Sequence, residues 1–202
     1  MLSSYKLYIF DFDGTIRLLR VTSYITSIFK IRYKRFYLSK YKINNINLEV
    51  VEKEYKFFAK FYGLFAGILP PRMIENVDSF INLLKNDKKK IAIFSDSKAF
   101  VIVKDLRKMG LIDYFDYILS ADLLDRYKPN PSGLIYLLNR FKIDKRDAIY
   151  IGDMPVDVIT AKLAGIDSCA VSTGLGNIKS LRWAKPNFVF KDYNEIIKAY
   201  KG

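Results

Sequence analysis

Short apolar runs bounded by polar turns recur along the chain and predict buried strands. These runs are Tyr5–Phe10, Ile91–Phe94, Tyr117–Leu119 and Ala148–Ile151, with two more near Ala170 and Phe188. Between the runs, apolar residues recur at helical spacing, which predicts helices over about 73–84, 98–109, 131–141 and 155–164 and at the C-terminus. Strands that alternate with helices are typical of a parallel sheet covered on both faces. We therefore expect an α/β fold with a Rossmann-like parallel sheet.

Helix start and stop signals agree with these boundaries. Gly110 and Gly165 stand directly after two predicted helices, where glycine is favoured. Asn130 and Pro131 offer an N-cap and a first-turn proline to the helix that follows them.

One stretch interrupts the alternation directly after the first predicted strand. Apolar residues recur at helical spacing over 21–38 and again over 48–62, and a pair of prolines ends the stretch. The pattern predicts an α/β core of residues 1–16 and 73–202, with a small helical domain of residues 17–72 inserted into it.

Composition restricts the chemistry. The 202 residues are 50% hydrophobic and 27% charged, which suits a folded body with a sizeable core. Cys169 is the single cysteine, so no internal disulfide can form and we expect a reducing cytosol. The absence of histidine excludes Ser-His-Asp and Cys-His nucleophile pairs, histidine general bases and histidine zinc sites. Any metal would be bound through oxygen, as Mg²⁺ is.

The net charge of +13 favours anionic partners such as phosphate esters, nucleic acid or acidic lipid, although a basic surface can also simply face water. The basic residues are spread along the chain without a recognisable nucleic-acid module, so we do not expect a nucleic-acid partner. The longest apolar stretch, Phe61–Leu69, is about half the length that a membrane-spanning helix needs. No signal peptide is apparent, and no membrane partner is expected.

Polar and acidic side chains follow three of the predicted strands. They are Asp11 and Asp13, Ser95 and Asp96, and Asp153 and Asp157. Lys128 lies in a further loop, just before a helix. Because parallel strands end at one edge of a sheet, we expect these side chains to lie close together. Clustered carboxylates repel one another without a cation, so the charges predict an oxygen-ligand Mg²⁺ site with Lys128 as a further neutralising group.

The same residues, in this order, resemble the four motifs of the haloacid dehalogenase (HAD) superfamily. The motifs are Asp11-Phe12-Asp13-Gly14-Thr15, Ser95 after a hydrophobic strand, Lys128-Pro129, and Gly152-Asp153-x-x-x-Asp157. The resemblance covers nearly all of the chain outside residues 17–72. That stretch stands where the phosphoglycolate phosphatase and β-phosphoglucomutase branch carries a helical cap. The resemblance therefore implies a HAD-like core with a helical cap that supplies substrate contacts.

The resemblance also implies catalytic roles. Asp11 would be the nucleophile that forms an aspartyl-phosphate. Asp13 would protonate the leaving alcohol and then deprotonate the attacking water, and its presence favours phosphoryl transfer over halide displacement. Lys128 would pair with Asp11 and the phosphate, whose oxygens would also accept from the Ser95 hydroxyl and the Asp96 backbone N–H. The alternative for Ser95 is a helix N-cap, a post that Ser97 could equally fill.

Metal ligands are implied in the same way. Mg²⁺ would be bound by Asp11, by Asp153 and by the backbone carbonyl of Asp13. Asp157 would act on the metal through water or from the next shell of residues. Because Asp157 falls in the first turn of a predicted helix, its alternative is a plain capping role.

The function implied is Mg²⁺-dependent hydrolysis of a small phosphomonoester, with phosphoglycolate as the first candidate substrate. Two alternatives remain open. A phosphosugar mutase would transfer the aspartyl-phosphate to a sugar hydroxyl, and a binding protein would keep the fold without catalysis.

The inserted stretch raises the question of substrate choice. Residues 17–72 hold twelve Lys or Arg and three Glu, which suits a substrate with a second negative charge. Relatives often have an acidic residue followed by Ser or Thr where this chain has Leu18 and Leu19, so no relative's substrate transfers directly. Arg17 and Arg20 are candidates to bind a substrate carboxylate, and the alternative is that both bridge core and cap on the solvent side.

Overall fold

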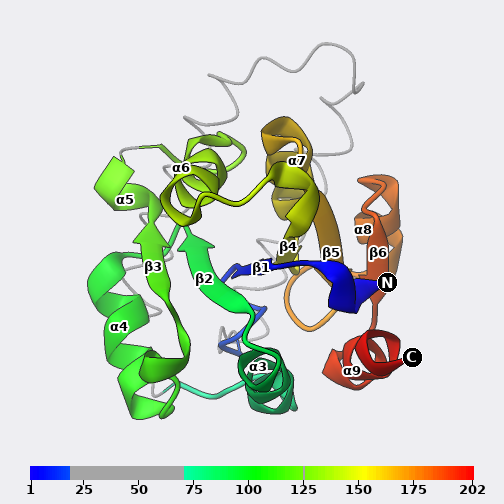
Figure 1. Ribbon diagram of the computed structural model, residues 1–202, viewed down its shortest axis with the longest axis horizontal. Coiled ribbons are helices and arrows are strands. Elements are labelled where there is room, and N and C mark those ends of the chain that lie inside the picture. The colour runs from blue at the N-terminus through cyan, green and yellow to red at the C-terminus, as the bar shows by residue number, and fades with distance from the viewer. Residues whose placement is uncertain (19–70, 125) are drawn as a thin grey trace, which may run out of the picture.

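The computed structural model describes residues 1–18, 71–124 and 126–202. Within these ranges six parallel strands form one sheet in the order β3-β2-β1-β4-β5-β6 (Figure 1). The strands are β1 (Leu7–Phe10), β2 (Lys90–Ser95), β3 (Tyr117–Ser120), β4 (Ala148–Gly152), β5 (Asp167–Val171) and β6 (Phe188–Phe190). The predicted α/β fold with a parallel sheet is confirmed.

The first strand lies inside the sheet, between β2 and β4. All four residues of β1 are buried, and Phe10 stands opposite Ile93 of β2 and Ile151 of β4. Because the three strands are parallel and in register, they all end at the same edge of the sheet. The polar residues that follow each strand are therefore brought together by strand order alone.

Helices cover both faces of the sheet (Figure 1). The longer helices are α3 (Val77–Asn86), α4 (Ala99–Lys108), α6 (Ser132–Phe141), α7 (Pro155–Ala164) and α9 (Tyr193–Lys201). Shorter elements are α5 (Ala121–Leu124), α8 (Ile178–Trp183) and 3-10 turns at Leu2–Ser4, Ile112–Tyr114 and Lys145–Asp147. None of the described helices has the length and apolar character needed to span a membrane.

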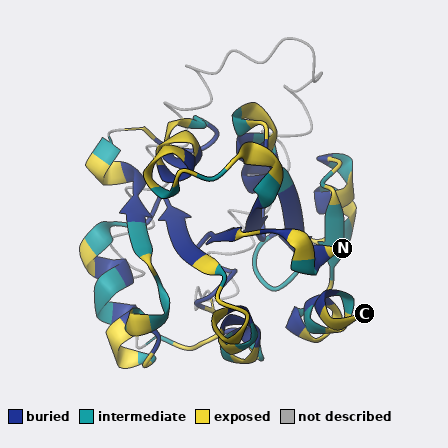
Figure 2. Cartoon of the chain, viewed as in Figure 1, coloured by how far each residue is buried: buried dark blue, intermediate teal, exposed yellow. Residues whose placement is uncertain are grey.

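Side chains of β1 alternate between two apolar clusters, as the pleat of a strand requires. Tyr8 and Phe10 pack with residues of α3, α4 and α9, whereas Leu7 and Ile9 pack with residues of α6 and α7. Figure 2 shows the result, a buried sheet between helices whose outer faces are exposed. The core thus holds the carboxyl ends of the central strands in fixed positions.

The helix predicted from residue 73 begins later, at Val77. Residues 72–74 are instead paired with residues 16–18. Leu18 N donates to the carbonyl of Arg72 at 2.7 Å, and Ile74 N donates to the carbonyl of Ile16 at 2.9 Å. This segment is thus bridged to residues 16–18 in the manner of a short strand instead of beginning the helix, and the pairing was not visible in the apolar spacing.

The expected inserted domain, residues 17–72, lies almost wholly outside the described residues, as do Leu19 and Arg20. Its two described ends are adjacent, because Leu18 N donates to the carbonyl of Arg72 and Arg17 forms an antiparallel bridge with Met73, the first residue after the segment. The division into a core and a helical cap therefore stays a prediction.

Two other helix boundaries agree with the sequence signals, and the start of α6 differs by one position. Gly110 and Gly165, with φ of 70° and 75°, follow the ends of α4 and α7. The α6 helix is assigned from Ser132, and the side chain of Asn130 accepts from Ser132 N at 3.0 Å. The asparagine side chain thus binds the start of α6, but the N-cap residue is Pro131, so the predicted Asn130 N-cap and first-turn Pro131 lie one position too early.

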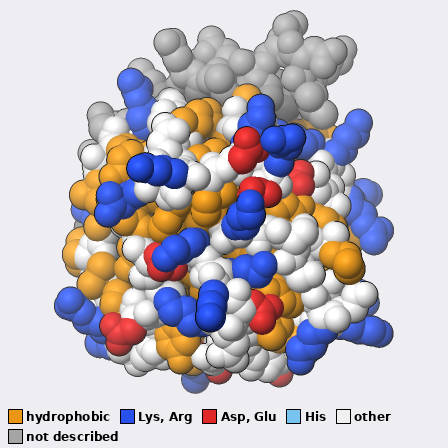
Figure 3. Space-filling model, in the orientation of Figure 1, with side chains coloured by type: hydrophobic (Ala, Val, Ile, Leu, Met, Phe, Trp, Pro, Cys, Tyr) orange, Lys and Arg blue, Asp and Glu red, His pale blue; other side chains and the backbone are white. Residues whose placement is uncertain are grey.

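Positive charge is dispersed over one face of the described surface. On the face seen in Figure 3, Lys and Arg side chains are interspersed with acidic, apolar and neutral groups instead of forming one stripe. The large positive charge of the chain is therefore not concentrated on this face.

Helix α6 approaches the sheet closely at Gly133. A Cβ atom at this position would lie 2.1 Å from Cε2 of Phe94, a fully buried side chain of β2. Only a hydrogen fits there, so α6 and β2 are held at a fixed separation.

We predict that Gly133→Ala lowers the free energy of unfolding by about 1–3 kcal/mol, because the added methyl group overpacks the contact with Phe94. Urea unfolding measures the change. Asn139→Ala, at an exposed position of the same helix, is the control and should change stability by no more than about 0.5 kcal/mol. A Gly133→Ala variant as stable as the wild type would contradict the close packing of α6 on β2.

Candidate active site

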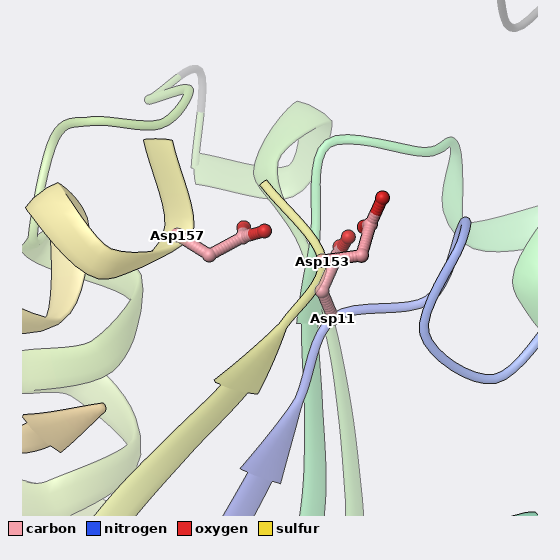
Figure 4. A group of neighbouring side chains, drawn as sticks. All are labelled: Asp11, Asp153 and Asp157. Carbon is pink, nitrogen blue, oxygen red and sulfur yellow. The ribbon is translucent and has the colours of Figure 1, made fainter. Parts of the chain in front are cut away.

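Three buried carboxylates meet at the carboxyl edge of the sheet (Figure 4). Asp11 directly follows β1, Asp153 directly follows β4, and Asp157 lies in the first turn of α7. One oxygen from each lies within 4.8 Å of the others. The structure therefore brings together three of the four residues predicted to bind metal.

Lys128 contributes the positive charge of this cluster. Its Nζ lies 2.9 Å from Oδ1 of Asp11 and 2.7 Å from Oδ1 of Asp157, and its side chain is only 3% exposed. The expected pairing with Asp11 is present. The pairing with Asp157 was not expected.

Asp157 also stabilises the start of its own helix. Its Oδ2 accepts from the backbone N–H of Met154 at 2.9 Å, while Oδ1 accepts from Lys128. The capping alternative for Asp157 is thus correct for one oxygen, and the other oxygen faces the cluster.

A loop after β5 supports Asp153 from the other side. Leu175 N donates to Oδ2 of Asp153 at 2.8 Å, and Thr173 Oγ1 donates to the carbonyl of Gly14 at 2.6 Å. A Cβ atom at Gly174 would lie 1.9 Å from the same Asp153 oxygen. Sequence reasoning missed this loop, although its glycines, Gly174 and Gly176, were a usable signal for a close backbone approach.

Burial makes the cluster electrostatically costly. It raises the pKa of Asp11 to about 6, a rise that Lys128 opposes and Asp157 reinforces. It also raises the pKa of Asp153 well above its usual range, with Asp157 and Asp11 adding to the effect. Burial alone would lower the pKa of Lys128, but the facing Asp11 and Asp157 carboxylates raise it well above its usual value. Lys128 therefore stays cationic.

These residues fit a hard divalent cation. Three carboxylates face one ammonium group, so the cluster carries an excess of negative charge when ionised. Oδ1 of Asp11 is buried and, among the described residues, accepts no hydrogen bond of good geometry. Carboxylate oxygens of this kind are the preferred protein ligands of Mg²⁺.

The Asp13 carboxylate lies beside the cluster, not in it. Its Oδ1 accepts from Nε of Arg17 at 2.7 Å and also from Nη2, and its Oδ2 accepts from the Ser97 hydroxyl. The metal contact expected of Asp13 involves its backbone carbonyl and stays a prediction. The contacts from Arg17 and Ser97 were not foreseen.

Arg17 does not lie on the solvent side, so that expectation is wrong. Its side chain is 4% exposed, and its guanidinium binds Asp13 and the fully buried Asp105 of α4. All three of its nitrogen atoms donate to carboxylates, so the substrate role considered for it is not supported by this geometry. Arg20 lies outside the described residues.

The predicted phosphate-binding segment ends β2. Ser95 is buried, and neither Ser95 nor Ser97 caps α4, whose N-cap residue is Lys98 without a side-chain cap bond. The capping alternative for Ser95 is therefore wrong. Its Oγ instead accepts from Ser97 N at 3.3 Å, which closes the turn at the strand end.

Asp96 was predicted to act only through its backbone N–H, but its carboxylate has a role in the loop. Oδ1 accepts from the backbone N–H of Lys128 at 3.1 Å, so Asp96 fixes the loop that carries the lysine. Oδ2 is buried without a hydrogen-bond partner in the described part of the chain. Burial raises the pKa of Asp96 to about 7, although Lys128 opposes the rise.

Comparison with known proteins identifies the sequence family. Residues 8–171 match the family model of haloacid dehalogenase-like hydrolases. The phosphoglycolate phosphatase of Neisseria meningitidis is 28% identical over 151 residues, which is 73% of this chain and 64% of that protein. The PpaX protein of Caldanaerobacter subterraneus, which has pyrophosphatase in its name, is 27% identical over 128 residues, or 63% of this chain and 58% of that protein.

A solved structure has the same fold. The crystal structure of a predicted phosphoglycolate phosphatase from Haemophilus somnus matches with a TM-score of 0.72 and 19% identity, covering 98% of this chain and 99% of that one. At that identity the likeness concerns the fold alone. The chain spans less than two thirds of the length of either curated relative.

We predict that Mg²⁺ stabilises the protein more at pH 8 than at pH 5.5. Protons compete with the cation once the pH falls below the raised carboxyl pKa values, of which that of Asp11 is about 6. Saturating Mg²⁺ should raise Tm by roughly 5 °C or more at pH 8 and by less than half as much at pH 5.5.

Asp153→Asn should abolish this gain, and without metal it should melt higher than the wild type at pH 8, because one of the mutually repelling charges is gone. The control is Asp113→Asn, at an exposed position in the 112–114 turn, which should behave as the wild type. An equal gain at both pH values, or a gain that survives in Asp153→Asn, would contradict a cation site in the cluster.

Proposed function

This chain belongs to the haloacid dehalogenase-like hydrolase family, and we propose that it is a Mg²⁺-dependent phosphatase that hydrolyses a small phosphomonoester through an aspartyl-phosphate on Asp11. The observation that carries the proposal is the buried Asp11 carboxylate, which follows β1 and lies 2.9 Å from Lys128 within a cluster of three carboxylates. A carboxylate in this setting is an established type of phosphoryl acceptor.

In the first half-reaction, an oxygen of Asp11 attacks phosphorus and the bond to the leaving oxygen breaks. Asp13 donates a proton to that oxygen, so the product leaves as a neutral alcohol. In the second half-reaction, water attacks the phosphorus, its proton passes to Asp13 and the bond to Asp11 breaks. Inorganic phosphate leaves and both aspartates return to their starting states.

Groups at the ends of β2 and in the Lys128 loop would hold the transferring phosphoryl group. Lys128 keeps its positive charge, and the Ser95 hydroxyl and Asp96 backbone N–H would act as neutral donors from the end of β2, at the same edge of the sheet. Donors fixed before the reaction stabilise the charge that develops on the phosphoryl oxygens without reorganising.

The metal ligands in this proposal are the side chains of Asp11, Asp153 and Asp157, with the backbone carbonyl of Asp13. A bound Mg²⁺ would neutralise the carboxylates and the phosphate dianion, which would otherwise repel each other. The Leu175 N–H and the glycine loop keep Asp153 oriented for this contact.

Phosphoglycolate is the first substrate to test, because a relative of the chain is named for that activity. The panel includes a hexose phosphate, for which isomer formation without phosphate release would indicate the mutase alternative, and inorganic pyrophosphate. No phosphate release from any monoester with Mg²⁺ present would contradict the proposal and favour a binding protein. The single buried thiol, Cys169, suits the reducing cytosol that we propose as its compartment.

We predict that Asp11→Asn lowers kcat by roughly 1,000-fold or more, because a carboxamide cannot attack phosphorus at a useful rate. The amide keeps the shape of the carboxylate, so circular dichroism should show an unchanged fold. Phosphate release under saturating substrate measures the loss.

Asp113→Asn is again the matched control and should retain full activity. An Asp11→Asn variant that keeps more than about a tenth of the wild-type kcat, a barrier change below about 1.4 kcal/mol, would rule out Asp11 as the nucleophile.

A further inference from the structure

Arg17 and Asp105 form a buried ion pair outside the carboxylate cluster. The Arg17 side chain is 4% exposed and that of Asp105 is fully buried, and Nη1 of the guanidinium donates to Oδ2 of Asp105. The other two nitrogen atoms, Nε and Nη2, both donate to Oδ1 of Asp13, with Nε at 2.7 Å. Arg17 therefore connects the carboxylate of the proposed acid and base to helix α4.

The backbone fixes Arg17 independently of Asp13. Arg17 N donates to the carbonyl of Phe12 at 2.9 Å, and Gly14 N donates to the carbonyl of Arg17 at 2.8 Å. The guanidinium carbon lies 5.0 Å from the centre of the Phe12 ring, a cation–π distance. The arginine is thus held by its backbone hydrogen bonds, by the Phe12 ring and by Asp105, in addition to its contact with Asp13.

Asp13 is held at both oxygens. Arg17 donates to Oδ1, and the Ser97 hydroxyl donates to Oδ2. A lone carboxylate side chain rotates easily, whereas one fixed by donors on both oxygens has a defined direction. Asp13 is partly exposed, with 14% of its side chain accessible, whereas Arg17 and Asp105 are buried.

A buried ion pair is an expensive way to obtain stability, because desolvation cancels much of the Coulomb attraction. Apolar residues in place of Arg17 and Asp105 would pack the same space without that cost. The pair does supply a rigid, two-pronged donor aimed at one oxygen of Asp13, which apolar residues cannot supply.

We propose that Arg17, held by Asp105, is a positioning residue for the proton transfers of Asp13, an inference that rests on the proposed phosphatase function. A general acid acts only within hydrogen-bond reach of the leaving oxygen. Such catalysis typically raises the reaction rate by ~10²–10⁴-fold. A carboxylate released from Arg17 would spend less time within that reach. Loss of Arg17 should therefore impair the step that needs a proton and spare a step that needs none.

The leaving group of the substrate determines whether the first half-reaction needs a proton from Asp13. An alkyl phosphate expels a poor leaving group that must be protonated, whereas 2,4-dinitrophenyl phosphate expels a stable anion without help. The parameter to measure is kcat/KM, because it reports only the steps up to departure of the leaving group and excludes the later attack of water.

For Arg17→Met, kcat/KM should fall at least tenfold on the best alkyl phosphate and less than about threefold on the dinitrophenyl ester. Asp13→Asn should show the same selectivity, and the double variant should lose little beyond Asp13→Asn alone, since both changes act on one proton transfer. Arg140→Met is the matched control, because Arg140 is an exposed arginine over the Tyr117 ring, and it should behave as the wild type.

Arg17→Met leaves two carboxylates without their buried partner and so could fail to fold. A second variant keeps the proposal testable in that case. Asp105→Asn keeps an oxygen acceptor for Nη1 and removes one charge. It should show the same leaving-group selectivity to a smaller extent, a threefold to tenfold loss on the alkyl phosphate alone.

Equal losses on both substrates, or no loss on either, would overturn the proposal for Arg17. These outcomes differ from failure of the phosphatase proposal itself, in which the wild-type protein with Mg²⁺ would release no phosphate from either ester. Additive losses of kcat/KM in the double variant would also overturn the proposal for Arg17, because Arg17 would then act independently of Asp13.

Discussion

The mutual repulsion of three buried carboxylates is the constraint on which the rest of the site depends. Asp11, Asp153 and Asp157 present oxygens within 4.8 Å of one another, and all three are buried. Lys128 pairs with two of them and compensates only part of their charge. Such a cluster lowers the stability of the metal-free fold, so its presence points to a bound cation.

Strand order and small residues together make the cluster possible. The register of β1 with β4 brings Asp11 and Asp153 to one edge, and the glycines let the backbone approach them. A Cβ atom at Gly14 would lie 2.4 Å from Oδ2 of Asp153, and one at Gly152 would lie 2.4 Å from Cβ of Asp157. The glycines in both motifs therefore leave room for the acidic side chains, besides any role in turns.

Much of this was predictable because it depends on local pattern and on the geometry of parallel sheets. Alternating strands and helices predicted the sheet, and the sheet predicted that Asp11, Asp153 and Lys128 would converge. The Arg17–Asp105 pair could not be predicted, because its members are 88 positions apart and nothing in their local sequence marks them as partners. Leu175 acts through its backbone N–H, which any residue other than proline has, so its identity gave no signal.

Two errors arise from contacts between segments far apart in the sequence. Residues 72–74, ahead of the start of α3 at Val77, are paired with residues 16–18, and the Arg17 side chain is buried against Asp13 and Asp105. Apolar spacing reports which face of an element is buried, and it does not report which backbone groups are bonded to a distant segment. A charged residue next to a motif therefore carries no local sign that its partners lie within the core.

Binding of Mn²⁺, a spectroscopically visible substitute for Mg²⁺, tests the central claim most directly. Equilibrium dialysis of the metal-free protein at pH 8, with the free ion counted by electron paramagnetic resonance, gives the stoichiometry and affinity. The carboxylate cluster predicts one Mn²⁺ per chain, displaced by excess Mg²⁺ and lost in Asp153→Asn. No saturable binding, or a site of unchanged affinity in Asp153→Asn, would contradict the claim that these three carboxylates exist to hold a cation.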